Sequence, residues 1–368
     1  MNNEITTAYE EIIEDYFNSF PEYSIPINYL DEVYNDSQKS NHWPARKHLA
    51  LVDIVNNKPS FKCHALEGGE KLPYGRFKTA LDFIKKLTRL YKFEDTKFLL
   101  FTADSAHVDF PCFGVIRSFH SDLYWPNLMI PFPLGNANGM NKGWGSPIVG
   151  WDDYVKKNIV QIGEKYPWES KINKTVWRGS FKMITWAAGK FSKKKIKSWK
   201  DCARAKLYLE SKDKGDIFDI GITSIADKNH NPELPVPDEV YKKIEIKNSI
   251  HFAEMQKYKA ILVVGNVCDW CERVRGQLFM NSVMVLQDCD EKAQEFFYNL
   301  LEPYVHYVPV KGDLSDLHEV GKWIVNNDSE VKKIIKNANE FARKYLCEES
   351  TYEYGRLAIE KYTRLLKS

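Results

Sequence analysis

The feature that most constrains the fold is an alternation of apolar and amphipathic segments between residues 260 and 326. Three short apolar runs, at residues 260–264, 283–287 and 306–310, have the length and composition of buried strands. Each is followed by a segment with apolar residues at helical spacing, at residues 271–281, 291–301 and 314–326. Strands that alternate with helices form parallel sheets with helices on both faces. The second half therefore predicts a doubly wound, Rossmann-like α/β domain.

The first half predicts a second α/β domain. A helix at residues 77–91 precedes an apolar strand at residues 97–103, and residues 8–20 and 44–56 predict further helices. A chain of 368 residues is longer than one core usually supports. We therefore expect two Rossmann-like domains facing across a cleft, at residues 1–169 and 170–346, with a C-terminal helix at 347–368 that can pack back on the first domain.

The overall charge gives no reason to expect nucleic-acid binding. The 52 Lys and Arg residues nearly balance the 50 Asp and Glu residues, and the basic run at residues 190–206 is interpreted as a solvated loop and helix face. The N-terminus is acidic and no apolar run approaches about 18 residues, so neither a signal peptide nor a membrane span is expected. Seven scattered cysteines indicate free thiols in a reducing cytoplasm.

A first candidate anion site is the segment Arg178-Gly179-Ser180, which follows a predicted strand at residues 174–176. A forked cation, a flexible glycine and a hydroxyl at a strand end suit a phosphate. The alternative is a surface arginine before a turn glycine.

A second candidate begins at Gly265 and Asn266, directly after the strand at residues 260–264, with Arg273 in the helix that follows. Free N–H groups at a helix start and a nearby arginine can neutralise a diphosphate. The loop lacks the glycine pattern of dinucleotide-binding proteins, so a dinucleotide cofactor is not predicted.

Three other patterns are interpreted as structural. Cys268 and Cys271 form a lone pair without the second pair that zinc usually needs. Asp288 and Asp290 have the spacing that some glycosyltransferases use for a metal ion, but Asp290 stands where an aspartate caps a helix. His107 is a single histidine. No metal site is predicted.

Three groups of short motifs stand in a fixed order along the chain. They are residues 150–153, 166–168 and 175–180 (GWDD, YPW, TVWRGS), residues 257–260 and 281–285 (KYKA, NSVMV) with Arg273 between them, and residues 296–298, 301–311 and 313–317 (FFY, LEPYVHYVPVK, DLSDL). In this order they resemble the motifs of glycosyltransferase family 90, which includes animal protein O-glucosyltransferases, fungal capsule-associated xylosyltransferases and lipopolysaccharide-modifying proteins. The resemblance runs from about residue 51 to residue 365 and is strongest in the second half.

The resemblance implies the two-domain GT-B glycosyltransferase fold, with a UDP-sugar donor held mainly by the second domain. It also implies an aspartate base from the first domain, after the strand that ends near Asp104. The family's short signature there is Arg-Asp-aromatic-Pro, and this chain has Ala103-Asp104-Ser105-Ala106. Asp109, two residues before Pro111, is the alternative base.

The resulting hypothesis is an inverting transfer of a hexose or pentose, glucose or xylose first, to a hydroxyl of a glycan, a lipopolysaccharide or a protein. Asp104 takes the hydroxyl proton, and Arg178 and Arg273 stabilise the departing diphosphate, so that neither a metal ion nor a cofactor is needed. A glycoside hydrolase with two facing carboxylates and a non-catalytic nucleotide- or glycan-binding module are the alternatives. The sugar, the acceptor and the oligomeric state are left open.

Overall fold

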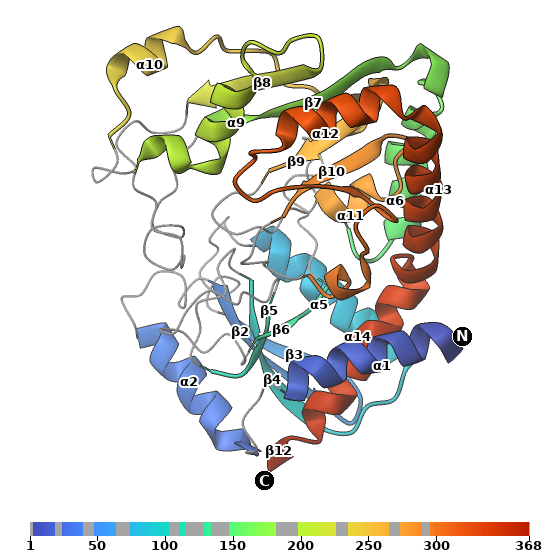
Figure 1. The fold of residues 1–368 in the computed structure, drawn as a ribbon. Coiled ribbons are helices and arrows are strands. Elements are labelled where there is room, and N and C mark those ends of the chain that lie inside the picture. The colour runs from blue at the N-terminus through green and yellow to red at the C-terminus, as the bar shows by residue number, and fades with distance from the viewer. Residues whose placement is uncertain are drawn as a thin grey trace. The chain divides into compact units, whose positions relative to one another are not determined.

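The computed structural model describes residues 3–18, 24–39, 48–63, 74–102, 110–114, 129–133, 147–181, 198–225, 235–264, 273–288 and 295–367. The chain divides into two compact α/β units (Figure 1). Unit 1 comprises Met1–Asp152, Ala293–Asn299 and Lys344–Ser368, and unit 2 comprises Asp153–Lys292 and Leu300–Arg343. The domain limits predicted from the sequence stay a prediction.

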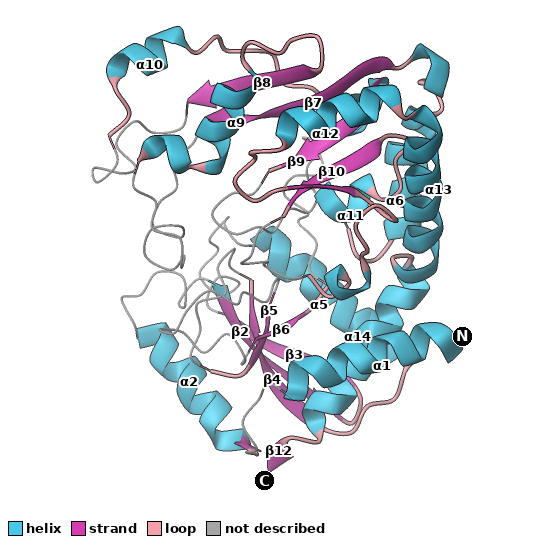
Figure 2. Cartoon of the chain, viewed as in Figure 1, coloured by secondary structure: helices cyan, strands magenta, loops and turns pink. Residues whose placement is uncertain are grey.

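Unit 2 contains a parallel sheet of five strands, so the doubly wound expectation for the second half is confirmed at the level of the sheet. Its spatial order is β11-β10-β9-β7-β8, and Figure 2 labels β8, β7, β9 and β10 among these strands. The strands are β7 Ile172–Phe181, β8 Phe218–Ile225, β9 Tyr258–Val263, β10 Val283–Gln287 and β11 Val308–Val310.

The helices of unit 2 cover the sheet through apolar side chains. They are α7 Gln161–Gly163, α9 Ala203–Ser211, α10 Asp238–Lys243, α11 Arg273–Gln277 and α12 Leu317–Asn326, with α6 Trp151–Val155 and α13 Asp328–Tyr345 at the limits of the unit. A Cβ on Gly321 of α12 would lie 2.7 Å from Cζ of Phe218. The glycine therefore lets α12 approach β8 closely.

Unit 1 contains a mixed sheet in the order β3-β2-β4-β5-β6. The strands are β2 Leu49–Val55, β3 Lys58–Cys63, β4 Thr96–Phe101, β5 Cys112–Gly114 and β6 Met129–Pro131. Strand β2 is antiparallel to β3 and β4, whereas β4, β5 and β6 are parallel. The strand predicted before Asp104 is β4, and it ends at Phe101.

The helix predicted at residues 44–56 is wrong in its described part, where β2 stands instead. Asn56 and Asn57 have φ values of 51° and 60° and connect β2 to β3 as a two-residue hairpin loop. Asparagine tolerates this left-handed conformation better than most residues, and such a loop suits the twist of a hairpin.

The helices of unit 1 are α1 Asn3–Asn18, α2 Ile27–Lys39, α5 Tyr74–Leu90 and α14 Glu348–Thr363. The segment between α1 and α2 is tied to the C-terminal segment, because β1 Ile25–Pro26 pairs with β12 Leu366–Lys367. The hydroxyl of Tyr354 in α14 donates to the carbonyl oxygen of Pro131 at 2.6 Å, and its ring packs on Tyr9 of α1. The C-terminal helix is thus an integral part of unit 1.

Other predicted elements differ mainly in length. Strand β10 has the predicted bounds, whereas the helix predicted at 271–281 is the five-residue α11 in its described part. The described part of the helix predicted at 291–301 holds only a 3₁₀ turn, Tyr298–Leu300. Within the described ranges, the structure contains no helix with the length and apolar character that crossing a membrane requires.

Candidate functional site

The strand order of unit 2 selects one edge of its sheet. Strand β7, the first of the unit in sequence, lies between β8 and β9. The chain therefore continues from β7 to one side and later returns to β7's other side. In such sheets, ligands bind beyond the carboxyl ends of the two strands where the order reverses, here β7 and β9.

Predicted site residues lie on these strands and in segments beyond them. Arg178, Gly179 and Ser180 lie within β7, because the strand predicted at 174–176 extends from Ile172 to Phe181. Arg273 is the first residue of α11. Asp288 directly follows β10, and its backbone N–H donates to the carbonyl oxygen of Val310 at 2.6 Å. The remaining predicted or weighed residues lie outside the described residues: Asp104, Asp109, His107, Gly265, Asn266, Cys268, Cys271 and Asp290.

Arg178 is buried, with 8% of its surface exposed, and is held by β7 and β8. Its Nη1 donates to the carbonyl oxygens of Trp177 at 3.0 Å and Asp219 at 2.6 Å. Its Nη2 donates to Oδ2 of Asp219 at 2.9 Å, which completes a bidentate contact with that residue. Such a fork fixes both the distance and the plane of a guanidinium group.

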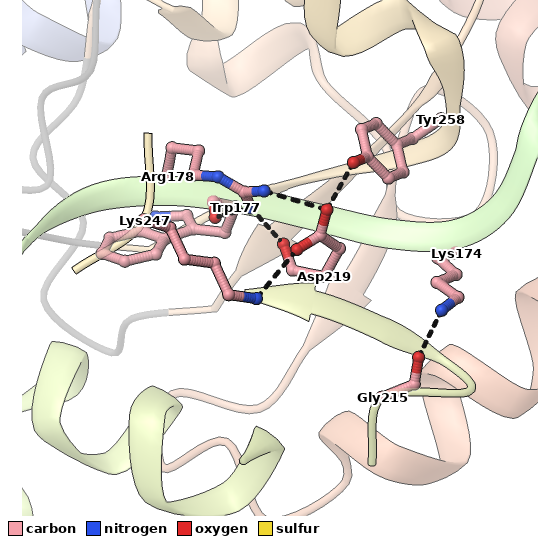
Figure 3. A network of polar contacts seen from close by, with 7 residues as sticks. All are labelled: Lys174, Trp177, Arg178, Gly215, Asp219, Lys247 and Tyr258. Atoms are coloured by element: carbon pink, nitrogen blue, oxygen red, sulfur yellow. Dashed lines mark hydrogen bonds and ion pairs between the residues drawn. The ribbon is translucent and has the colours of Figure 1, made fainter. Parts of the chain in front are cut away.

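The Asp219 carboxylate collects donors from three directions (Figure 3). Besides Arg178, Nζ of Lys247 donates to Oδ1 at 3.1 Å and the hydroxyl of Tyr258 donates to Oδ2. Burial alone would raise the pKa of Asp219, but the hydrogen bonds from Arg178, Tyr258 and Lys247 outweigh it and hold this pKa well below its ordinary value. Burial and the bond to Asp219 raise the pKa of Tyr258 to about 12.

Two glycines make room for this arrangement. Gly221 lies opposite Arg178 in the β7–β8 register, and a Cβ there would lie 2.8 Å from Cδ and Nε of Arg178. A Cβ on Gly179 would lie 2.5 Å from the indole of Trp177. The guanidinium group and the indole therefore both lie close against the sheet backbone.

Ser180, near the carboxyl end of β7, is contacted by Arg204 of α9. Nη1 of Arg204 donates to the Ser180 carbonyl oxygen at 3.1 Å and contacts its hydroxyl oxygen at 2.9 Å. The Arg204 guanidinium group lies 5.6 Å from the centre of the Trp177 ring. A cation, a hydroxyl and an indole are thus gathered close to the carboxyl end of β7.

Sequence reasoning missed Asp219, Tyr258, Lys247 and Arg204. Arg204 belongs to the basic run at 190–206, and the interpretation of that run as a solvated face is wrong for this residue, which packs on β7. Asp219 lies between apolar residues in β8, a strand that the sequence analysis does not predict. Aspartate is uncommon in strands, so its presence in this apolar run is the signal that could have identified it as a site residue.

A second buried cation lies at the amino end of the same sheet. Lys171, 7% exposed, directly precedes β7. Its Nζ donates to the carbonyl oxygen of Gln256, to Oδ1 of Asn281 at 2.7 Å and to Oγ of Ser282 at 3.1 Å. Burial lowers the pKa of Lys171 to about 7.

A parallel sheet whose strand order reverses between β7 and β9, with an arginine, a glycine and a serine on β7, places unit 2 in the doubly wound class of α/β architectures. The comparison with protein families identifies the group within that class. The model of glycosyl transferase family 90 matches residues 141–368, and the chain belongs to this family.

Individual relatives support the same family. Protein O-glucosyltransferase 2 of Danio rerio is 32% identical over 54% of this chain and 34% of its own length. Protein O-glucosyltransferase 3 of Homo sapiens is 33% identical over 43% of this chain and 29% of its own length. Uncharacterized protein 035R of Invertebrate iridescent virus 3 is 29% identical over 54% of this chain and 17% of its own length. The chain thus spans about a third or less of these relatives.

Proposed function

We propose that the protein transfers a sugar from a UDP-sugar to a hydroxyl group of an acceptor, with inversion at the anomeric carbon. The observation that carries this proposal is the family match together with the cation-lined carboxyl end of β7 at the switch point. The relatives named protein O-glucosyltransferases favour glucose and a protein acceptor. Xylose as the sugar, and a glycan or a lipopolysaccharide as the acceptor, remain part of the proposal.

The proposed donor site comprises Arg178, Gly179 and Ser180 on β7, Gly265 and Asn266 after β9, and Arg273 at the start of α11. Arg204 joins this set because it contacts Ser180. Arginine side chains in a preorganised site stabilise the charge that grows on a departing diphosphate, which is the task that a metal ion performs in other enzymes. We therefore propose transfer without a metal ion.

The proposed base is Asp104, with Asp109 as the alternative, in a fold of the GT-B type. The acceptor oxygen loses its proton to the aspartate and attacks the anomeric carbon, while the bond from that carbon to the UDP oxygen breaks on the opposite face. Asp104 lies three residues after Phe101, the end of β4, and Asp109 lies three residues before Cys112, the start of β5. Asp104 is preferred because it follows the carboxyl end of a parallel strand, the edge at which ligands of such sheets bind.

The experiment is a thermal-shift and turnover panel with nucleotide sugars, with and without EDTA. The proposal expects UDP and one UDP-sugar to raise the melting temperature in EDTA, and release of UDP to require an acceptor. Cleavage of glycans without any nucleotide sugar would instead support a glycoside hydrolase. Binding of UDP without turnover over a broad acceptor panel would support a binding module.

A further inference from the structure

We propose that Arg178 and Asp219 form a positioning pair, in which Arg178 fixes the end of β7 by bonding to Asp219 and does not itself carry charge to the donor diphosphate. This inference rests on the proposed donor site and narrows the role of one residue in it. On β7, the residues that meet the donor are then those beyond Arg178, namely Gly179 and Ser180.

The direction of the Arg178 side chain is the first argument. Arg178 pairs with Gly221 in the β7–β8 register, whereas Asp219, which its guanidinium group reaches, pairs with Val176. The side chain therefore turns back by two residues toward the amino end of β7. Ligands of such sheets bind at the opposite, carboxyl edge.

The inventory of N–H groups is the second argument. An arginine has five N–H donors. Three hydrogen bonds from Arg178, two from Nη1 and one from Nη2, go to Trp177 and Asp219, which leaves Nε and the second N–H of Nη2. Nε is buried and has no hydrogen-bond partner among the described residues. It lies over Gly221, where even a Cβ would come within 2.8 Å. The most enclosed N–H group of Arg178 is thus pressed against the sheet.

The pair of Arg178 and Asp219 also joins adjacent strands of the sheet. Arg178 belongs to β7, Asp219 to β8 and Tyr258 to β9, and both other side chains donate to the Asp219 carboxylate. One carboxylate therefore links the three adjacent strands that create the switch point. The link lies directly before an irregularity in β7, because the β7–β8 register shifts between Gly179 and Ser180. A bulge redirects the side chain that follows it, and here that side chain is Ser180, which Arg204 contacts.

The two possible roles of Arg178 predict opposite changes in UDP affinity for the variant Asp219→Asn. If Arg178 acts by its charge, removing the neighbouring negative charge leaves the local potential more positive, and UDP binds as well as before or more tightly. If Arg178 acts by position, the loss of a charged acceptor loosens its fork, and UDP binds more weakly. We expect about tenfold weaker binding, which is typical when a supporting partner of a ligand-binding group is lost.

Arg178→Lys provides the second variant. Lysine keeps the charge but cannot make the two-pronged contact with Asp219. The positioning role predicts that Arg178→Lys weakens UDP binding about as much as Arg178→Gln, and that Arg178→Gln combined with Asp219→Asn is hardly worse than either single variant. Lys247→Met is the matched control: it removes another cation bonded to Asp219 but leaves the fork intact, and it should change UDP affinity less than about threefold.

Isothermal titration with UDP measures these affinities, and amide hydrogen exchange of the peptides that cover Gly179 and Ser180 gives a readout that needs no donor. We expect faster exchange there in Asp219→Asn, with no change in β10, as a local loosening requires. Unchanged or tighter UDP binding with unchanged exchange would overturn the inference. A wild-type protein that binds no UDP contradicts the proposed function, and the exchange experiment then decides the inference alone.

Discussion

Unit 2 buries two cations along the same strand and satisfies them differently. Arg178, within β7, faces the carboxylate of Asp219, whereas Lys171, just before β7, faces the neutral oxygens of Gln256, Asn281 and Ser282. Burial disfavours any charge that has no opposite partner. The pKa of Asp219 is therefore held low beside its donors, while the pKa of Lys171 falls to about 7.

The difference shows which of the two buried charges stays constant as the pH changes. The ion pair of Arg178 and Asp219 keeps its charges across the neutral range, so its geometry does not vary with pH. Lys171 changes its charge near neutrality, and its neutral amine has only two N–H groups for the three acceptors. Only the ion pair of Arg178 and Asp219 is therefore suited to fixing a ligand site. Lys171 instead satisfies neutral oxygens at the amino edge of the sheet.

The largest expected effect is that of Asp219→Leu. It leaves Arg178 buried without a negative partner, and we expect the free energy of unfolding to fall by about 3–5 kcal/mol. The double variant Arg178→Met with Asp219→Leu should regain most of this loss, because a buried apolar pair replaces a buried ion pair at little cost. Urea unfolding of both variants measures it. If Asp219→Leu costs no more than Lys171→Met, the contrast between the two sites fails.

Lys171→Met should cost less, about 1–2 kcal/mol at pH 7, because the lost bonds leave neutral oxygens behind. The pH dependence is the sharper measurement. The ordinary pKa of 10.5 describes the unfolded chain and about 7 the folded one, so between these values the unfolded state binds more protons. Wild-type stability relative to Lys171→Met should therefore rise with pH from about 7 to about 10. A flat difference would mean that Lys171 keeps its proton in the fold.

The sequence predicts the helices and strands better than it predicts the partners of Arg178 and Lys171. Strand β10 has the predicted bounds, and the helices predicted at residues 314–326 and 347–368 correspond to α12 and α14, because strongly periodic segments of this length carry their own signal. The helix predicted at residues 44–56 is wrong because a short apolar run fits either element. The Asn56-Asn57 pair, whose φ values suit a hairpin loop, is the feature that distinguishes the two.

The site was predictable only in part, for a different reason. Arg178 was recognisable from its neighbours in sequence, but its partner Asp219 lies 41 residues away and Tyr258 lies 39 residues beyond that. These residues meet because the strand order places β7 between β8 and β9. A single sequence shows residue types and spacing but not which strands become neighbours, so it did not show that Arg178 faces the carboxylate of Asp219.

Tyr258→Phe should have a moderate effect, about 1 kcal/mol, because Arg178 and Lys247 still hold the Asp219 carboxylate. The pKa of Tyr258 is raised from 10.0 to about 12 in the fold. Its contribution is therefore complete below pH 10 and is lost as the pH rises toward 12. Denaturant unfolding of wild type and variant at pH 8 and pH 11 measures the change. An equal difference in the free energy of unfolding at pH 8 and at pH 11 would mean that the bond to Asp219 does not raise the pKa of Tyr258 in the fold.

The smallest expected effect concerns His306. Like Lys171, His306 is a basic group whose pKa is lowered by burial. Nδ1 of His306 accepts from the backbone N–H of Glu302 at 3.0 Å, and its ring packs on Phe341. Burial lowers the pKa of His306 from its ordinary 6.5, against the weaker opposing influence of Glu302. Protonation would remove the acceptor, so its contribution is present above pH 6.5 and is lost as the pH falls through the lowered value.

His306→Phe keeps a ring against Phe341 and removes only the acceptor, so it should cost about 0.5–1 kcal/mol at pH 7.5. That cost should shrink between pH 6.5 and pH 5, because the wild type loses the same bond when it takes up a proton while the phenylalanine cannot. Urea midpoints of the two proteins over this range measure the difference. A cost that grows toward pH 5 would mean that the folded protein favours the charged imidazole, so that Glu302 outweighs burial and His306 belongs with the paired charges of the Arg178 site.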